Sequence, residues 1–160
     1  MPKVIILMGS KGDLEHCNKI AKYLSVFGIH YELRVGSAHK VPLKALDIIK
    51  KNESEDTVFI TVAGRSNALS GFSDAQTYCP VIACPPYGDK FAGADIFSSL
   101  RMPSGVAVLT VLEPELAALA AAKIFSLKYP DIREKVKKYQ QDKRDELEKD
   151  DAELCQNMKK

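Results

Sequence analysis

Histidine is the side chain that most readily exchanges a proton near neutral pH, and this chain contains three of them, His16, His30 and His39. Only His39 falls in a segment, residues 36–40, that the sequence pattern places directly after a strand. His16 lies within a predicted helix and His30 at the start of a predicted strand, where packing or surface roles suit a histidine better. His39 could therefore act as a general acid or base. The alternative is a structural histidine that bonds to the backbone.

The segment GSKGD, residues 9–13, has the composition of an anion-binding loop. Its glycines let a ligand approach the backbone, Ser10 adds a hydroxyl donor, and the start of a following helix favours negative charge. The segment matches neither a Walker A loop nor a GxGxxG motif. Asp13 would repel a phosphate but could accept hydrogen bonds from ribose hydroxyls, so Ser10 with Asp13 fits a sugar phosphate. Lys40 adds a cation. A purely structural turn before a helix is the alternative.

A third polar segment, AGRSN at residues 63–67, also follows a predicted strand. Arg65 offers paired donors to anionic oxygens, and Ser66 and Asn67 could hold a small polar group or stabilise a developing negative charge. Either Ser66 or Asn67 could instead cap the next helix, and the two roles are compatible. No metal-ligand cluster and no Ser–His–acid set stands out. The Ala63-Gly64 end of the strand also disfavours a phosphorelay receiver.

The elements that would position these segments alternate regularly between strand and helix. Short apolar runs predict strands, and apolar residues at helical spacing predict helices. Asp13 is expected to cap the first helix and Gly28 to end it. The predicted strands cover residues 4–8, 31–35, 57–62, 80–84 and 106–111, and the predicted helices cover 13–27, 42–51, 67–76, 94–100 and 114–127.

Five strand–helix units predict an α/β fold, a three-layer, flavodoxin-like or Rossmann-like parallel sheet with helices on both faces. In such sheets ligands bind beyond the carboxyl ends of the strands. The polar segments that follow the strands should therefore converge on one edge.

Composition excludes several classes of protein. The chain has 160 residues and a net charge of +2, which disfavours a nucleic-acid binder, and no apolar run approaches the length needed to cross a membrane. No secretory signal is visible, and the four cysteines, none at zinc-knuckle spacing, are interpreted as reduced thiols. Cys84 is expected to be a small core residue. A cytoplasmic protein is the expectation.

The last 33 residues differ from the rest, since residues 128–160 carry 10 basic and 9 acidic side chains. We expect a catalytic α/β unit at 1–127 and a charged helical arm at 128–160 that is not a separate domain. A thin apolar stripe suggests one helix, either solvated or laid across a neighbouring subunit; the stripe consists of Ile132, Val136, Tyr139, Leu147, Leu154 and Met158.

Four strings in order, LMGSKGD, FGIHYELRVGSAHK, AGRSN and SSLRMPSGV, together resemble the phosphoribosylaminoimidazole carboxylase family of purine biosynthesis (PurE). The resemblance spans about residues 3–127. The mutase class of that family typically has Arg after the histidine of the second loop and a second histidine in the third loop. This chain has Lys40 and no histidine in AGRSN, which resembles the class II direct carboxylases that use carbon dioxide.

The resemblance implies a role for each segment. Ser10, Gly12 and Asp13 would bind phosphate and ribose, and Ser37 and Lys40 would complete the anion site. His39 would be the catalytic acid/base. Substrate binding would extend to the third loop, where the carbon dioxide or the new carboxylate would sit; that loop contributes Gly64, Arg65, Ser66 and Asn67.

The expected reaction is the reversible carboxylation of 5-aminoimidazole ribonucleotide (AIR) by carbon dioxide to 4-carboxy-5-aminoimidazole ribonucleotide (CAIR). The substrate ring is an enamine, so neither a metal nor another cofactor is required. The expected partners are this ribonucleotide, carbon dioxide and further copies of the chain in a homo-oligomer, an octamer by resemblance. The alternatives are the N5-carboxyaminoimidazole ribonucleotide mutase reaction and a non-catalytic nucleotide-sensing module.

Overall fold

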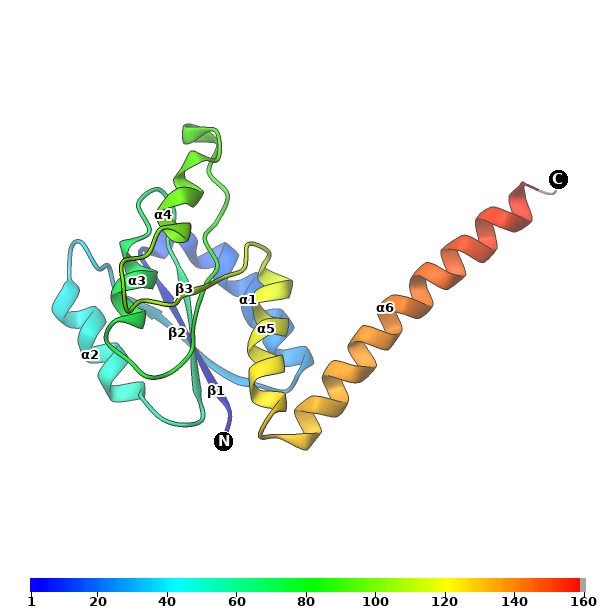
Figure 1. The fold of residues 1–160 in the computed structure, drawn as a ribbon, viewed down its shortest axis with the longest axis horizontal. Coiled ribbons are helices and arrows are strands. Elements are labelled where there is room, and N and C mark those ends of the chain that lie inside the picture. The colour runs from blue at the N-terminus through cyan, green and yellow to red at the C-terminus, as the bar shows by residue number, and fades with distance from the viewer. Residues whose placement is uncertain (159–160) are drawn as a thin grey trace.

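The computed structural model describes residues 1–158, apart from the side chain of Lys90. Its centre is a five-stranded sheet in the order β2-β1-β3-β4-β5, and every pair of neighbouring strands is parallel (Figure 1). The predicted α/β parallel sheet is thereby confirmed. The strands are β1 (Lys3–Met8), β2 (His30–Val35), β3 (Thr57–Val62), β4 (Val81–Ala83) and β5 (Leu109–Thr110).

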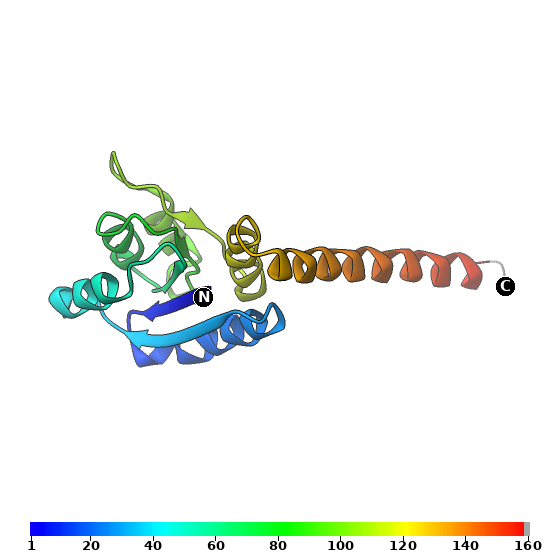
Figure 2. The same cartoon turned by 90° about the horizontal axis from the view of Figure 1, so that it is seen from below.

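Helices cover both faces of this sheet (Figures 1 and 2). Because successive side chains of a strand point to opposite faces, β1 is buried on both sides and contributes to two cores. Ile6 packs with the helices of one face, α1 (Leu14–Val26) and α5 (Pro114–Ser126). Ile5 packs on the other face, which is covered by α2 (Pro42–Asn52) and α3 (Ala68–Asp74). The continuous apolar run 4–8 follows from this double burial.

Several predicted elements are shorter than expected, among them the third helix, the fourth and fifth strands and the helix between those strands. The predicted strand 106–111 is reduced to β5, because the backbone N–H of Ala107 donates to the Asp74 carboxylate at 2.8 Å instead of to a neighbouring strand. The predicted helix 94–100 consists of a 3₁₀ turn at Ala94–Ile96 followed by the single turn of α4 (Phe97–Leu100).

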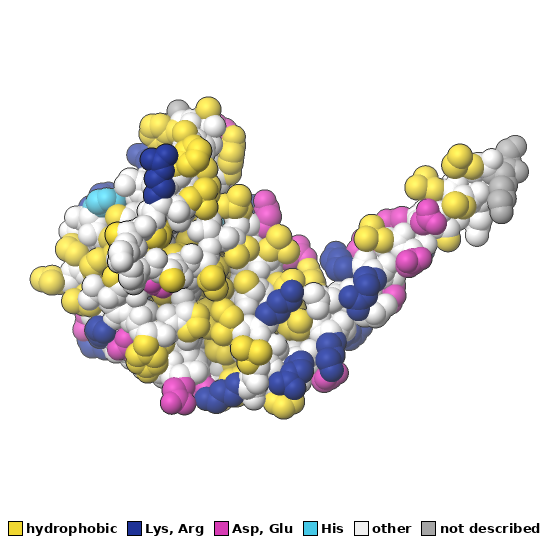
Figure 3. All heavy atoms as spheres, in the orientation of Figure 1, with side chains coloured by type: hydrophobic (Ala, Val, Ile, Leu, Met, Phe, Trp, Pro, Cys, Tyr) yellow, Lys and Arg dark blue, Asp and Glu magenta, His cyan; other side chains and the backbone are white. Residues whose placement is uncertain are grey.

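The charged arm forms one long helix, α6 (Pro130–Asn157), which leaves the body of the molecule at an angle (Figure 1). Its first turns are anchored, since Ile132 and Val136 are buried and the ring of Tyr139 lies edge-on to Phe27 with 5.4 Å between centroids. Further along, Leu147 is 69% exposed, and side chains of both charges intersperse along the helix surface (Figure 3). The apolar stripe is therefore buried within this chain only at its beginning.

A polar cluster holds the chain just before α6. Lys128 Nζ lies 2.6 Å from the Asp56 carboxylate, which also accepts a bond from the N-terminal amine of Met1 at 2.9 Å. The ammonium of Lys128, together with the N-terminal amine of Met1, holds the pKa of Asp56 well below its usual range. This cluster joins the beginning of the chain to the base of the arm.

No helix in the described part of the chain is both long and apolar enough to cross a membrane. All four cysteines are free thiols, and Cys17, Cys79 and Cys84 are buried while Cys155 is exposed. Cys84 is fully buried in the core, as the sequence predicts.

Candidate active site

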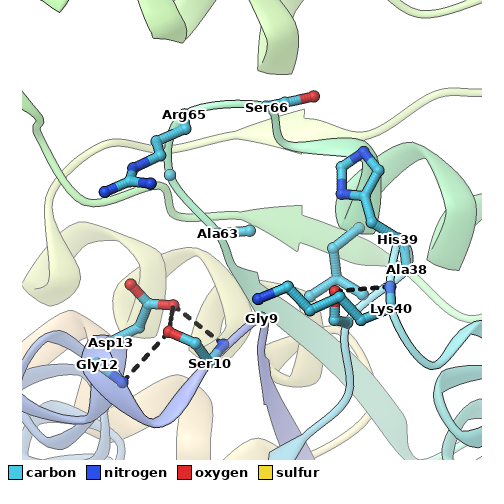
Figure 4. A pocket seen from close by; sticks show the side chains of 13 residues that line it. Gly9, Ser10, Gly12, Asp13, Ala38, His39, Lys40, Ala63, Arg65 and Ser66 are labelled. Atoms are coloured by element: carbon cyan, nitrogen blue, oxygen red, sulfur yellow. Dashed lines mark hydrogen bonds between the residues drawn. The ribbon is translucent and has the colours of Figure 1, made fainter.

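A cavity of about 570 Å³ lies where the carboxyl ends of β1, β2 and β3 meet (Figure 4). The parallel register explains this convergence, because Met8, Val35 and Val62 lie side by side as the last residues of their strands. The three loops that follow supply the walls. The lining consists of Gly9, Ser10, Gly12, Asp13, Ser37, Ala38, His39, Lys40, Ala63, Gly64, Arg65, Ser66 and Leu69.

The first loop, residues 9–13, is ordered by reciprocal bonds. Ser10 Oγ accepts from the N–H of Gly12 at 3.2 Å, and the Asp13 carboxylate accepts from both the N–H and the hydroxyl of Ser10 at 3.3 Å (Figure 4). Asp13 occupies the predicted N-cap position of α1, but its side chain makes no capping hydrogen bond there. A 3₁₀ turn at Lys11–Asp13 is inserted before α1, so the carboxylate turns back to Ser10.

The second loop begins at a glycine where even a Cβ atom would be tightly packed. A Cβ on Gly36 would lie 3.3 Å from both the Ala45 Cα and the Leu7 Cδ1. Glycine at position 36 therefore lets the chain pass closely between β1 and α2 before the loop reaches the cavity. Beyond it, Ser37 Oγ accepts from the N–H of Lys40 at 3.2 Å, which closes a turn around His39.

His39 and Lys40 are exposed on this turn, and Figure 4 shows the Lys40 ammonium extending across the cavity toward the first loop. Within the described residues, the structure shows no hydrogen bond to the His39 ring. The imidazole is therefore accessible to a ligand in the cavity, whereas a structural histidine would be bonded to the protein.

Not every residue of the third loop lines the cavity. Gly64, Arg65 and Ser66 line it, but Asn67 is only 2% exposed and lies behind the wall. Asn67 Oδ1 accepts from the N–H of Ser70 at 3.2 Å and so caps α3, while its Nδ2 donates to Ser99 Oγ at 2.9 Å. Of the two roles left open for Asn67, the structure shows the capping role.

A smaller cavity of about 200 Å³ lies on the other side of this loop and shares Ala63 and Gly64 with the first one. Its walls are mostly apolar, with Pro86 and Ile96 among them, and it also contains the carboxyl groups of Asp95 and Glu113. The sequence patterns assign no role to Asp95, although it lies just before the string SSLRMPSGV.

His16 and the thiols of Cys17 and Cys84 lie near this edge of the sheet but do not line the larger cavity. His16 is half-buried with Nε2 3.4 Å from the Cys84 Sγ, and burial lowers its pKa below 6.5. Burial also raises the pKa of the Cys17 and Cys84 thiols to about 12, so neither is poised as a nucleophile. In the described part of the chain, no group of three or more His, Cys, Asp or Glu side chains is arranged to hold a metal ion.

The sequence is similar to proteins with an assigned activity. It is 63% identical over 152 residues to the phosphoribosylaminoimidazole carboxylase of Archaeoglobus fulgidus, covering 95% of this chain and 84% of that protein. It is 49% identical over 127 residues to the mouse bifunctional phosphoribosylaminoimidazole carboxylase/phosphoribosylaminoimidazole succinocarboxamide synthetase, covering 78% of this chain and 30% of that one.

The fold agrees with these sequence relationships. The crystal structure of Treponema denticola PurE superposes with a TM-score of 0.93 at 51% identity, covering 96% of this chain and 99% of the other. The family model described as AIR carboxylase matches residues 3–146, which include every loop of the cavity and the first part of α6. On these grounds the chain belongs to the AIR carboxylase family of enzymes.

Proposed function

We propose that this enzyme carboxylates the ring carbon of AIR with carbon dioxide to form CAIR, a step of de novo purine biosynthesis. The observation that carries the proposal is the arrangement of the larger cavity. One accessible imidazole, His39, lines the same cavity as the proposed anion-binding loop at residues 9–13 and the hydrogen-bond donors of residues 64–66. The named relatives support the same activity.

The ribonucleotide would bind through the first two loops. Ser10 and the backbone around Gly12 would hold the phosphate, Asp13 would accept hydrogen bonds from the ribose hydroxyls, and Lys40 would balance the phosphate charge. Ser37 would support this site by holding Lys40 in its turn. The aminoimidazole ring would then lie between His39 and the third loop.

The chemistry requires a base and little else. The enamine carbon of the ring attacks carbon dioxide, a carbon–carbon bond forms, and the ring carbon then loses its proton. His39 would accept that proton in carboxylation and return it in decarboxylation. Gly64, Arg65 and Ser66 would hold the carbon dioxide and then the new carboxylate, whose negative charge suits the donors there. Asn67, which is buried behind the cavity wall, would fix the conformation of the third loop through its hydrogen bonds.

The composition of the loops favours direct carboxylation over the mutase reaction. Lys40 follows His39, and the third loop contains no second histidine that could handle the carboxylate of an N5-carboxylated substrate. The mutase activity is the alternative within the family. A nucleotide-sensing module is disfavoured by the names of the relatives, which are carboxylases, and by the presence of His39, Lys40 and Arg65 in one cavity.

Purified enzyme supplied with AIR and dissolved carbon dioxide tests the proposal. We expect CAIR to form from this mixture, faster when carbon dioxide itself is injected than when aged bicarbonate is used. The N5-carboxylated isomer without added carbon dioxide should be consumed only as fast as it decomposes to AIR. Rapid conversion of that isomer, with no product from AIR and carbon dioxide, would establish the mutase instead. Binding of AIR without any turnover would establish the sensing module.

We further propose that residues 1–127 form the catalytic unit, and that the arm at 128–160 serves assembly into a homo-oligomer, an octamer by family resemblance. Exposed leucines on α5, on α6 and in the link between these helices support this, namely Leu116, Leu147 and Leu127. Light scattering should give a mass near eight times the 17.7 kDa chain mass. Free thiols agree with a cytoplasmic location.

A further inference from the structure

The third loop has an unusual backbone at its centre. Arg65 adopts φ = 60°, in the left-handed region that non-glycine residues seldom occupy. Such a conformation is strained and persists only where the surroundings hold it, most often at functional sites. Neighbouring groups must therefore hold Arg65 in this conformation.

The groups that contact Arg65 come from a segment about thirty residues further along the chain. The backbone N–H of Arg65 donates to the Asp95 carboxylate at 3.1 Å. Ser98 Oγ accepts from the N–H of Asn67 at 3.0 Å and lies 3.3 Å from the carbonyl oxygen of Arg65. Two amides of the loop are thus bonded to the segment 95–98 behind it, and the carbonyl of Arg65 lies within reach of the Ser98 hydroxyl.

This segment is itself tied to the core. Ser98 Oγ lies 2.7 Å from the carbonyl oxygen of Asp95, and the hydroxyl of Ser99 accepts from Asn67 Nδ2. The carbonyl oxygen of Ser99 in turn accepts from the hydroxyl of Thr110 on β5, at 3.2 Å. The loop is therefore clamped between the sheet and the segment 95–99.

The clamp does not occupy every amide of the loop. Arg65 and Asn67 both donate backward, but among the described residues the N–H groups of Gly64 and Ser66 have no acceptor, and both residues line the larger cavity. Asp95 lines the smaller cavity behind the loop. It can therefore act on the larger cavity only through the backbone of Arg65.

We propose that Asp95 and Ser98 are positioning residues, which hold Arg65 in its left-handed conformation so that residues 64–66 present a preformed wall to the carboxylate. This inference rests on the proposed carboxylase function. Because the nucleotide would be held by the first two loops, loss of the clamp should impair the carboxylation step much more than nucleotide binding.

The test compares Asp95→Ala, which removes the acceptor, with Asp95→Asn, which keeps an oxygen acceptor of the same shape. Asp89→Ala, at an exposed aspartate six residues before Asp95, is the matched control. Asp95→Ala should lower kcat about tenfold or more and raise the KM for carbon dioxide, while the KM for AIR changes less than about threefold. Asp95→Asn should recover most of kcat, and Asp89→Ala should match the wild type.

Amide hydrogen exchange gives a readout that does not depend on turnover. The N–H of Arg65 should exchange faster in Asp95→Ala than in the wild type, and Asp95→Asn should restore its protection. If Asp95→Ala does not fold, Ser98→Ala should give the same loss of kcat at nearly unchanged KM for AIR. A wild type that acts only as a mutase would refute the proposed function alone, because the same variants then test the clamp in the mutase reaction.

Three outcomes would overturn the clamp. The first is a kcat for Asp95→Ala within twofold of the wild type. The second is an equal loss in Asp95→Ala and Asp95→Asn, which would show that the charge matters and not the acceptor. The third is a loss of AIR affinity as large as the loss of kcat, which would indicate general damage to the site.

Discussion

The Asp13 carboxylate accepts two hydrogen bonds from Ser10, one from its backbone N–H and one from its hydroxyl. Ser10 Oγ in turn accepts from the N–H of Gly12. An acid in a loop proposed to bind phosphate would be a disadvantage if it faced the phosphate directly. Here it orders the loop, and its second oxygen is available for the hydroxyls of a ribose.

Replacement of Asp13 tests this double role. In Asp13→Ala both bonds to Ser10 and the acceptor for ribose disappear, so the KM for AIR should rise about tenfold or more, since a hydrogen bond to a charged group contributes about 1.5–3 kcal/mol. The value of kcat should change much less. Asp13→Asn keeps an oxygen acceptor and should show a smaller rise. Steady-state kinetics and calorimetric binding of AIR provide the measurement, and an unchanged KM in Asp13→Ala would contradict the assignment.

His39→Asn removes the proposed base while keeping a polar side chain of similar size. Turnover should fall about a hundredfold or more, because general acid–base catalysis contributes that much. The affinity for AIR should stay close to that of the wild type, since other residues would contact the phosphate and the ribose. Turnover should be followed in both the carboxylation and the decarboxylation direction, which use the same group.

The matched control for this variant is His30→Asn, at an exposed histidine on the start of β2, at the opposite end of the sheet from the cavity. It should retain wild-type turnover. If His39→Asn kept more than about a tenth of wild-type activity, another group would have to supply the proton transfer.

The anchor of α6 provides a prediction about stability. Ile132 is buried against the core, so Ile132→Ala should lower the free energy of unfolding by about 2–4 kcal/mol through lost burial and a cavity. Leu147 is exposed on the same helix, so Leu147→Ala should change the stability of the single chain by less than about 0.5 kcal/mol.

Chemical denaturation at several protein concentrations separates packing from assembly in these two variants. The effect of Ile132→Ala should be present at every concentration. If α6 lies across a neighbouring subunit, Leu147→Ala should lower stability and the oligomer mass mainly in dilute solution. A concentration-independent loss in Leu147→Ala would instead place that side chain in the core of its own chain.

His16 should make stability depend on pH in a defined direction. Burial lowers its pKa in the folded state below the usual 6.5, so the unfolded chain binds a proton more readily. The free energy of unfolding should be unaffected by His16 above pH 6.5. It should then fall as the pH decreases below 6.5, until the folded pKa is passed.

Thermal unfolding between pH 7.5 and pH 5, on the wild type and on His16→Gln, measures this contribution. The wild type should lose more stability than the variant across that interval, because glutamine does not titrate. Equal losses would show that burial does not lower the pKa of the His16 imidazole in the folded chain.

Much of the fold could be predicted from sequence because local patterns report burial directly. The run Val4–Met8 is apolar throughout since β1 is covered on both faces, and β3 occupies the predicted residues 57–62 for the same reason. The fifth strand was overestimated, because an apolar run does not reveal that Asp74 takes the N–H of Ala107. Such a contact joins residues 33 positions apart, and no local pattern contains it.

The same distinction applies to the site. The residues that could do chemistry can be identified from sequence alone, because strand–loop–helix order brings residues 9–13, 36–40 and 63–67 to one edge of a parallel sheet. How these residues are used depends on the three-dimensional fold. It turned Asp13 back to Ser10, buried Asn67 behind the wall, and placed Asp95 against the strained backbone of Arg65. These roles depend on hydrogen bonds between distant segments or on a backbone angle, and neither is encoded in the spacing of residue types.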